Sequence, residues 1–290
     1  MRQMCFQGKP FIPADSPRTH LRPLFTTPLY STRVRPRLPS GARFPSPIRK
    51  QLMTTSFNTM GIIGAMDVEI ALLREEMAKA GAVKITRIAG MEFNVGTIGN
   101  TTVIVVQCGV GMVNAATCAQ VLVDRFGVGA LLNTGIAGSL DASINIGDIV
   151  VADDAVNHIM DVCNLGYAAG QTPGLDTMAF PCSPALSKSV VAAASAIGAT
   201  THTGRVASGD RFVRDNFEKQ RIIETFGAKC CEMEGAAIAQ VAWANGVPCA
   251  IVRAISDKAD GSSSMDYPTF EAQAARNSAA LVIAMLKRQG

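Results

Sequence analysis

Hydrophobic and polar positions alternate regularly from Gly61 onward in this chain of 290 residues. Short apolar runs, the first of which is GIIGAM at 61–66, alternate with segments such as 67–80, whose apolar residues recur at helical spacing. Further strands are predicted within 83–108 and near 129–136, 146–152, 203–208, 228–233 and 247–256, and further helices near 112–126, 184–197, 214–226, 235–245 and 270–288. This alternation predicts one α/β domain over residues 61–290, a three-layer α/β/α sandwich around a central, mixed and twisted sheet.

The first 60 residues differ in kind from the rest of the chain. They hold nine of the fourteen prolines and ten Lys or Arg against one acidic residue, Asp15, and they show no helical or strand period. An Arg-rich, Ser-rich and acid-poor segment is typical of an organellar transit peptide. A disordered basic tail explains the same composition, as does upstream sequence that is not translated because synthesis starts at Met53 or Met60.

The charge and the cysteine content of the chain restrict its expected partners and its cellular compartment. Residues 61–290 carry 17 basic and 22 acidic side chains, so nucleic acid is not favoured as a partner. Five of the eight cysteines lie in apolar runs, there is no CxxC motif, and the three histidines are isolated, which argues against zinc and favours a reducing compartment. No apolar run reaches about 18 residues, so no membrane span is predicted. We therefore expect a cytoplasmic protein, or an imported one if the extension is a transit peptide.

Acidic residues at the ends of predicted strands are the candidate catalytic groups. Asp257 ends the apolar segment 247–256, Glu234 follows Glu232 in the motif EMEG, and Glu69 lies in the first turn of the first predicted helix. Carboxylates are seldom buried without a partner or a role. Compensation of the helix dipole is a sufficient explanation for Glu69 taken alone, so the argument rests on the three acids together.

Glycine turns and one aromatic residue follow other predicted strands. Phe212, in the motif ASGDRFV, is placed to stack on a planar ring, although a lone phenylalanine is more often part of the core. Met233 between its two glutamates is likewise more often packing than binding. Cleavage of a nucleoside needs one acid to protonate the purine, one base to activate water and one carboxylate for the ribose diol, and the chain supplies that number of acids.

Six motifs follow one another along the chain: GIIGAMDVE, NTGIAG, GDIVVAD, ASGDRFV, EMEGAAIA and VRAISDKAD. With these motifs in this order, the chain resembles the 5′-methylthioadenosine/S-adenosylhomocysteine nucleosidases of the nucleoside phosphorylase superfamily. The resemblance covers the chain from about Gly61 to the C-terminus. It implies an α/β/α homodimer without cofactor or metal. It also implies hydrolysis of the N-glycosidic bond of adenine thionucleosides, with release of adenine, in methionine salvage and the removal of methyl-cycle by-products.

The same resemblance implies a role for each matching residue. Glu69 corresponds to the base that activates water, Asp257 to the acid that serves adenine N7, and Glu234 to the group that holds the ribose hydroxyls. The residues that contact the substrate or support these acids are Met66, Val110, Ala137, Gly138, Phe212, Val213, Glu232, Met233, Arg253, Ser256 and Phe270. The residues that reach into the pocket of a partner subunit are Val162, Leu165, Tyr167 and Pro173.

Three positions depart from the usual pattern of these nucleosidases. Ile136 stands where a hydroxyl residue often lies near the water, and Leu165 replaces a common aromatic residue of the 5′ pocket. Ala236 stands where threonine is frequent after the EME motif. The first two bear on hydration of the site and on the preference between the methylthio and the homocysteine substituent.

Two other functions are compatible with the same domain. A purine nucleoside phosphorylase must bind phosphate, which needs cationic side chains or clustered backbone N–H groups. Neither GAMDVE nor TGIAGS contains Lys or Arg, which favours water as the nucleophile. A non-catalytic nucleoside-binding or storage relative should lack at least one of the three acids, all of which are present.

Overall fold

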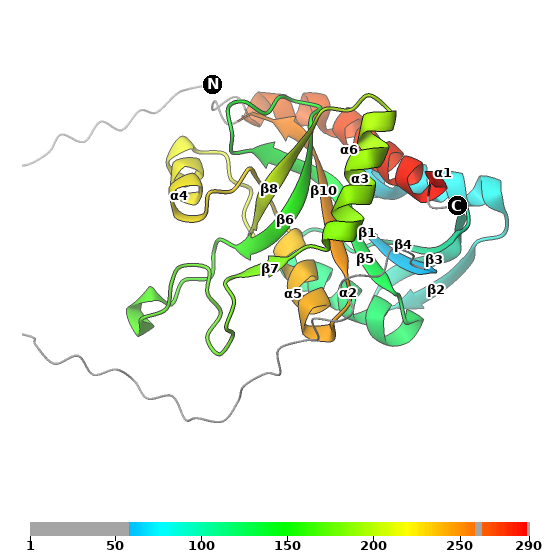
Figure 1. Ribbon diagram of the computed structural model, residues 1–290, viewed down its shortest axis with the longest axis horizontal. Coiled ribbons are helices and arrows are strands. Elements are labelled where there is room, and N and C mark those ends of the chain that lie inside the picture. The colour runs from blue at the N-terminus through cyan, green and yellow to red at the C-terminus, as the bar shows by residue number, and fades with distance from the viewer. Residues whose placement is uncertain (1–57, 259–262, 289–290) are drawn as a thin grey trace, which may run out of the picture. The chain divides into compact units, whose positions relative to one another are not determined.

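The computed structural model describes residues 58–258 and 263–288, with the backbone alone for 263–269 (Figure 1). The predicted basic extension, residues 1–60, lies outside the described residues apart from its last three positions. The first strand already begins at Thr59, two residues before the predicted domain start at Gly61. The end of the extension is therefore part of the sheet.

The strands and helices follow the predicted alternation. The strands are β1 (Thr59–Gly64), β2 (Lys84–Ile88), β3 (Met91–Ile98), β4 (Thr101–Gln107), β5 (Ala130–Ser139), β6 (Ile149–Asn157), β7 (Ala179–Pro181), β8 (Thr201–Ser208), β9 (Cys230–Glu232) and β10 (Cys249–Asp257). The helices are α1 (Asp67–Ala80), α2 (Met112–Phe126), α3 (Pro184–Ala196), α4 (Asn216–Phe226), α5 (Gly235–Asn245) and α6 (Ser263–Arg288), with a 3-10 turn, η1, at Cys163–Leu165.

One mixed sheet contains all of these strands. Its order is β10–β6–β8–β9–β5–β1–β4–β3–β2, and β7 pairs with β6. The long strand β5 pairs in parallel with β1 along one edge and with β10 along the other, and beyond the end of β1 it pairs with β9. Because β10 also pairs with β6, the strands β10, β6, β8, β9 and β5 close on themselves. The β1–β4 part of the sheet stays open.

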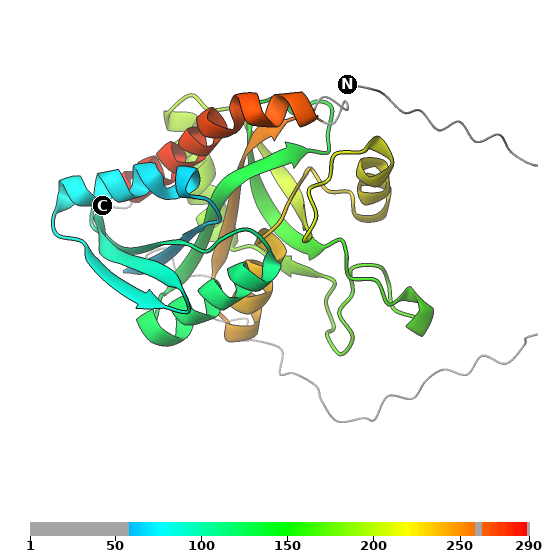
Figure 2. The same ribbon diagram turned by 180° about the vertical axis from the view of Figure 1, so that it is seen from behind.

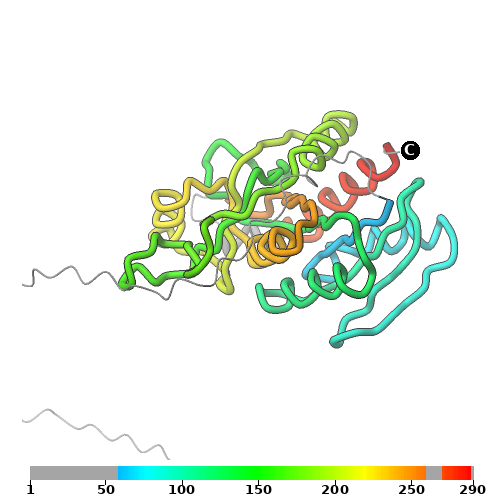
Figure 3. Tube along the Cα trace, turned by 60° about the horizontal axis from the view of Figure 1, so that its bottom comes forward, coloured from blue at the N-terminus to red at the C-terminus, as the bar shows by residue number. Residues whose placement is uncertain are grey.

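Helices cover both faces of the sheet, which confirms the predicted α/β/α class. On one face α1, α3 and α6 enclose a core that contains Leu73, Val190 and Leu286, and α6 runs beside α1 (Figure 2). On the other face α2 and α5 lie side by side over a core that contains Leu122 and Ile238 (Figure 3). None of the described helices is long and apolar enough to cross a bilayer.

Two elements differ from the prediction. The strand β7 has only three residues, which is too short to show a period of two, and it is stabilised by antiparallel pairing with β6. The helix α6 begins at Ser263 and not near residue 270. The serines and the proline at 263–268 have low helix propensity, so the local sequence predicted a loop where the chain continues as a helix.

Candidate active site

The carboxyl ends of the parallel strands β1, β5 and β10 meet at one edge of the sheet, where α/β proteins generally bind ligands. A cavity of about 80 Å³ opens there. Its described lining residues are Ala65, Met66, Glu69, Val110, Ile136, Ala137, Gly138, Phe212, Cys231, Glu232, Met233, Glu234, Ser256 and Asp257. Among the described residues there is no group of three or more His, Cys, Asp or Glu side chains arranged to hold a metal ion.

Glu69 takes the place of the missing cap at the start of α1. Its Oε2 accepts hydrogen bonds from the backbone N–H of Ala65 at 2.7 Å and of Met66 at 3.0 Å. Its Oε1 accepts a bond of 3.1 Å from the N–H of Ile136 on β5. Burial raises the pKa of Glu69, against the opposing effects of the Arg253 charge and of these three N–H donors. The carboxyl group is thus fixed in place, and its raised pKa makes it a stronger proton acceptor than an exposed glutamate.

The motif TGIAG lets β5 approach this carboxylate closely. A Cβ at Gly135 would lie 2.5 Å from Oε1 of Glu69 and 3.2 Å from Nη1 of Arg253, so a side chain at this position would displace both groups. The next residue, Ile136, borders the cavity and places an apolar side chain beside Glu69. One wall of the site around Glu69 is therefore apolar.

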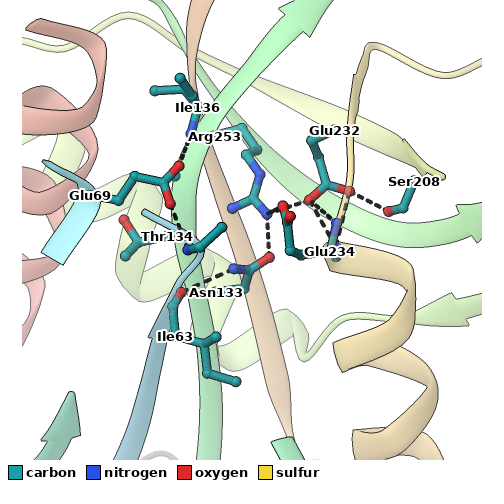
Figure 4. A network of polar contacts seen from close by, with 12 residues as sticks. Ile63, Glu69, Asn133, Thr134, Ile136, Ser208, Glu232, Glu234 and Arg253 are labelled. Carbon is teal, nitrogen blue, oxygen red and sulfur yellow. Dashed lines mark hydrogen bonds and ion pairs between the residues drawn. The ribbon is translucent and has the colours of Figure 1, made fainter. Parts of the chain in front are cut away.

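A fully buried arginine connects the carboxylates (Figure 4). Arg253 on β10 donates from Nη2 to Oε2 of Glu232 and to Oδ1 of Asn133, and the same nitrogen lies 3.9 Å from Oε2 of Glu234. A buried guanidinium is tolerated when carboxylates compensate its charge. Arg253 therefore allows several acids to share one cavity.

Both oxygens of Glu232 are engaged inside the protein. Oε1 accepts from the hydroxyl of Ser208, and Oε2 accepts from the backbone N–H of Glu234 at 3.1 Å and of Gly235 at 2.8 Å, in addition to Arg253. Glu232 thereby anchors the first turn of α5 to β8 and β10. It borders the cavity, but its hydrogen-bonding capacity is already used.

Glu234 stands at the N-terminus of α5, and within the described structure its carboxylate accepts fewer hydrogen bonds than that of Glu232. Its Oε1 accepts a hydrogen bond of 2.8 Å from the backbone N–H of Gly111, at the start of α2. Burial and repulsion by Glu232 raise the pKa of Glu234 to about 7, although Arg253 and the Gly111 N–H act in the opposite direction. The group is balanced between its acid and its carboxylate form near neutral pH.

Asp257 is the last residue of β10, where the register of the pairing with β5 shifts. The hydroxyl of Ser256 donates a bond of 3.1 Å to Oδ1 of Asp257. A Cβ at Gly138 would lie 2.8 Å from Oδ2, so the glycine leaves room for the carboxylate. Only 1% of Asp257 is exposed, and it borders the same cavity as Met66 and Val110.

The turn after β8 carries the aromatic wall of the cavity. Phe212 is 44% exposed and borders the cavity, while Val213 is buried and lines an adjoining hollow. The carboxylate of Asp210 accepts a hydrogen bond of 2.7 Å from the N–H of Met112, which ties this turn to the N-terminus of α2. The turn that carries Phe212 is thus connected to the segment that also binds Glu234.

Residues 59–287 match the family described as the phosphorylase superfamily. The chain belongs to this superfamily. The 5′-methylthioadenosine/S-adenosylhomocysteine nucleosidase of Treponema pallidum is 41% identical over 254 residues, which cover 79% of this chain and 93% of the relative. The nucleosidase of the same name from Geobacillus thermodenitrificans is 39% identical over 226 residues, which cover 78% and 94%.

Solved structures of the superfamily have the same fold. The nucleosidase of Neisseria meningitidis in complex with methylthio-immucillin-A superposes with a TM-score of 0.76 at 35% identity, covering 80% of this chain and 99% of that one. The futalosine hydrolase of Helicobacter pylori has a TM-score of 0.76 at 30% identity, covering 80% and 98%. These findings confirm the predicted fold class and the resemblance in the sequence.

Five residues that the resemblance assigns to a pocket, four of them to that of a partner subunit, do not line the described cavity of their own chain. Phe270 is on α6, is 37% exposed, and is not among the described residues that line the cavity. Val162, Leu165, Tyr167 and Pro173 lie on the segment between β6 and β7, which projects from the sheet (the green segment at the lower left of Figure 1), and they do not line the cavity of their own chain.

Some residues at this site have no counterpart in the prediction. Asn133 and Ser208 lie within quoted motifs, and their buried polar side chains on apolar strands are the signal that points to them. Cys231 borders the cavity where the sequence suggests only an apolar strand residue. Lys219 lies in an amphipathic helix outside every motif, and no feature of the local sequence connects it with the site.

Proposed function

We propose that this chain hydrolyses the N-glycosidic bond of 5′-methylthioadenosine and S-adenosylhomocysteine, with release of adenine. The main support for this proposal is the set of side chains that line the cavity. Among the described residues that line it are four acids, Glu69, Glu232, Glu234 and Asp257, and no Lys, Arg or His. The nucleosidase names of relatives that are 34–41% identical support the same reaction.

Asp257 is the proposed proton donor to the leaving purine. Its carboxyl group is buried, is oriented by the Ser256 hydroxyl, and borders the cavity near the Phe212 turn. Protonation at N7 makes adenine a neutral leaving group and so lowers the barrier to breaking the bond between C1′ and N9. Phe212 offers an exposed aromatic face on which the purine ring stacks.

Glu69 is the proposed base for the attacking water. Its raised pKa allows it to take a proton from water as the oxygen bonds to C1′. Glu234 accepts hydrogen bonds from the ribose hydroxyls, and its negative charge stabilises the positive charge that develops on the sugar. The charge of Arg253 acts on both acids, and its guanidinium lies 3.9 Å from Oε2 of Glu234.

A phosphate-dependence assay separates hydrolysis from phosphorolysis. We expect the chain to release adenine from 5′-methylthioadenosine at the same rate with and without inorganic phosphate, and to yield free 5-methylthioribose, because the described cavity wall has no cation for phosphate. Chromatography of the sugar product measures the outcome. Strict dependence on phosphate, with a sugar 1-phosphate as product, would show a phosphorylase, and absence of turnover would indicate a binding protein.

We propose that the active form is a homodimer in which the segment between β6 and β7 of one subunit completes the 5′ pocket of the other. Leu165 on this segment is 52% exposed, and Val113 at the cavity end of α2 is 75% exposed. Exposed apolar groups of this size are typical of surfaces that become covered in an assembly. A two-fold dimer would bury both on a self-complementary interface.

Leu165→Glu is expected to weaken the dimer and to lower kcat/KM for 5′-methylthioadenosine about tenfold or more, because a charge is costly in a buried interface. Sedimentation velocity together with kinetics at matched protein concentration measures both effects. Ile85→Glu is the control, since Ile85 is 54% exposed on β2. A fully active monomer would contradict the proposal.

Residues 1–52 are expected to be dispensable for catalysis, whereas a start at Met60 removes part of β1. The backbone oxygen of Thr59 accepts a bond of 2.9 Å from Gly129, and that of Asn58 one of 3.3 Å from Thr102. A chain of residues 53–290 should therefore keep the Tm and kinetic constants of the full chain, and one of residues 60–290 should have a lower Tm. Thermal melts of the three chains test this. A lower Tm for residues 53–290 would show that the extension packs on the domain.

The basic extension bears on where the protein is located. We propose that residues 53–290 are cytoplasmic when expressed alone and that import, if it occurs, depends on the basic extension. Fluorescent fusions of the full chain and of residues 53–290 distinguish the two cases, since identical cytoplasmic distributions would remove any targeting role from the extension.

A further inference from the structure

A buried lysine lies behind the carboxyl group of Asp257. Lys219 is on α4, and only 2% of its side chain is exposed. Its Nζ lies 4.0 Å from Oδ2 of Asp257 and donates a hydrogen bond of 2.7 Å to the backbone carbonyl of Lys258, the residue that follows. The ammonium thus contacts both the side chain and the backbone at the end of β10.

Burial of this ammonium needs compensation. Transfer of a charged group from water into a protein interior costs free energy unless an opposite charge and hydrogen bonds replace its hydration. At Lys219 the carbonyl of Lys258 supplies a hydrogen bond, and Asp257 supplies the opposite charge when it is ionised. The attraction between the two groups is therefore largest when Asp257 has no proton.

Among the residues that the structure describes, the other charged groups around this pair have partners of their own. Glu232 on β9 is paired with Arg253, and Glu218 on α4 lies 3.1 Å from the guanidinium of Arg211. Cys231 on β9 lies close to both members of the pair, but burial raises the pKa of its thiol to about 12, so it stays neutral. Within the described part of the chain, Asp257 is therefore the carboxylate on which the nearby ammonium of Lys219 acts.

We propose that Lys219 is a positioning residue that stabilises the carboxylate of Asp257 as it forms during hydrolysis, an inference that rests on the proposed function. In this step the proton of Asp257 passes to N7, and the bond between C1′ and N9 breaks with its electron pair on the purine. The water oxygen bonds to C1′, and a water proton goes to Glu69. Lys219 keeps its proton throughout. Because negative charge on Asp257 grows toward the transition state, the ammonium lowers the barrier without tightening substrate binding.

The test is Lys219→Gln, which keeps a hydrogen-bond donor for the Lys258 carbonyl but removes the charge. We expect kcat to fall about tenfold or more while KM changes by less than about twofold, the pattern of an interaction made only in the transition state. The basic limb of the pH profile of kcat/KM should move to higher pH, because Asp257 holds its proton more tightly without a cation beside it. Lys219→Arg should keep the limb at the wild-type pH.

Lys188→Gln, at an exposed position of α3, is the control for loss of a lysine charge and should match the wild type. In the background of Asp257→Asn, Lys219→Gln should have no further effect on kcat, since it acts through Asp257. If Lys219→Gln does not fold, Lys219→Met carries the same expectations.

Two results would overturn the role of Lys219. One is an unchanged pH profile in a folded variant without a charge at position 219. The other is a loss of kcat on Lys219→Gln that is as large in the Asp257→Asn background as in the wild type. These results leave the proposed function intact if Asp257→Asn alone is slow. Normal turnover by Asp257→Asn overturns the assignment of the acid, and the role of Lys219 with it.

Discussion

Asp257→Asn is expected to lower the turnover of 5′-methylthioadenosine by about 10²-fold or more, the usual scale for loss of a general acid. Asparagine has nearly the shape of aspartate, and its oxygen still accepts the bond that Ser256 donates to Oδ1 at 3.1 Å. The substitution removes only the proton that N7 takes as adenine leaves. Release of adenine in a single turnover, followed by chromatography, measures the chemical step apart from product release.

A substrate that needs no proton on its leaving group makes this test specific. When the bond from C1′ to oxygen breaks in a nitrophenyl 5-methylthioriboside, nitrophenolate leaves as a stable anion without needing a proton, so Asp257→Asn should affect this hydrolysis much less than that of the nucleoside. Asp124→Asn, at an exposed position of α2, is the matched control and should have normal kinetics with both substrates. Near-normal hydrolysis of the nucleoside by Asp257→Asn would contradict the assignment.

Glu69→Gln and Glu234→Gln are each expected to lower kcat by about 10²-fold or more, because one removes the base and the other the charge that stabilises the developing cation. Both residues are buried, at 4% and 6% exposed, but they border the cavity, and glutamine preserves their shape. Both variants should therefore fold. Steady-state kinetics and circular dichroism test this, with Glu75→Gln on the exposed side of α1 as the control.

The stability of Glu234→Gln has a predicted dependence on pH. The pKa of Glu234 in the folded protein is raised from 4.5 to about 7, so the folded state binds more protons than the unfolded state between these values. The wild type should lose stability as pH rises through this window, by at most about 1.4 kcal/mol per pH unit for one proton. The variant lacks this loss, and its unfolding midpoint in urea should be the higher of the two at pH 8.

A role for Glu234 in folding alone predicts the opposite result. If Glu234→Gln is less stable than the wild type at pH 8 and retains its activity per folded molecule, then the hydrogen bond from Gly111 to Glu234 serves the fold and not the reaction. Loss of activity together with equal or higher stability is the pattern expected of a carboxylate that is buried for catalysis.

The sequence by itself determined the α/β class, the position of nearly every helix and strand, and the location of the acids at strand ends. These are local properties. Apolar periodicity marks the elements, and a strand whose last residues are Ser256 and Asp257 carries its carboxylate to the edge of the sheet whatever its neighbours are. The motifs around Glu69, Glu234 and Asp257 therefore indicate a nucleoside-cleaving site before any contact is known.

The tertiary structure decided which of these residues meet and in what electrostatic environment. Arg253 and Asn133 are 120 residues apart and are brought together by the register of β10 and β5, whereas Lys219 reaches Asp257 from a helix outside every motif through the packing of that helix. Closure of the sheet through the pairing of β5 with β10 also depends on register. Burial, which sets the raised pKa values of Glu69 and Glu234, is a property of the whole packed core. Local sequence specifies none of these because each depends on residues far apart in the chain.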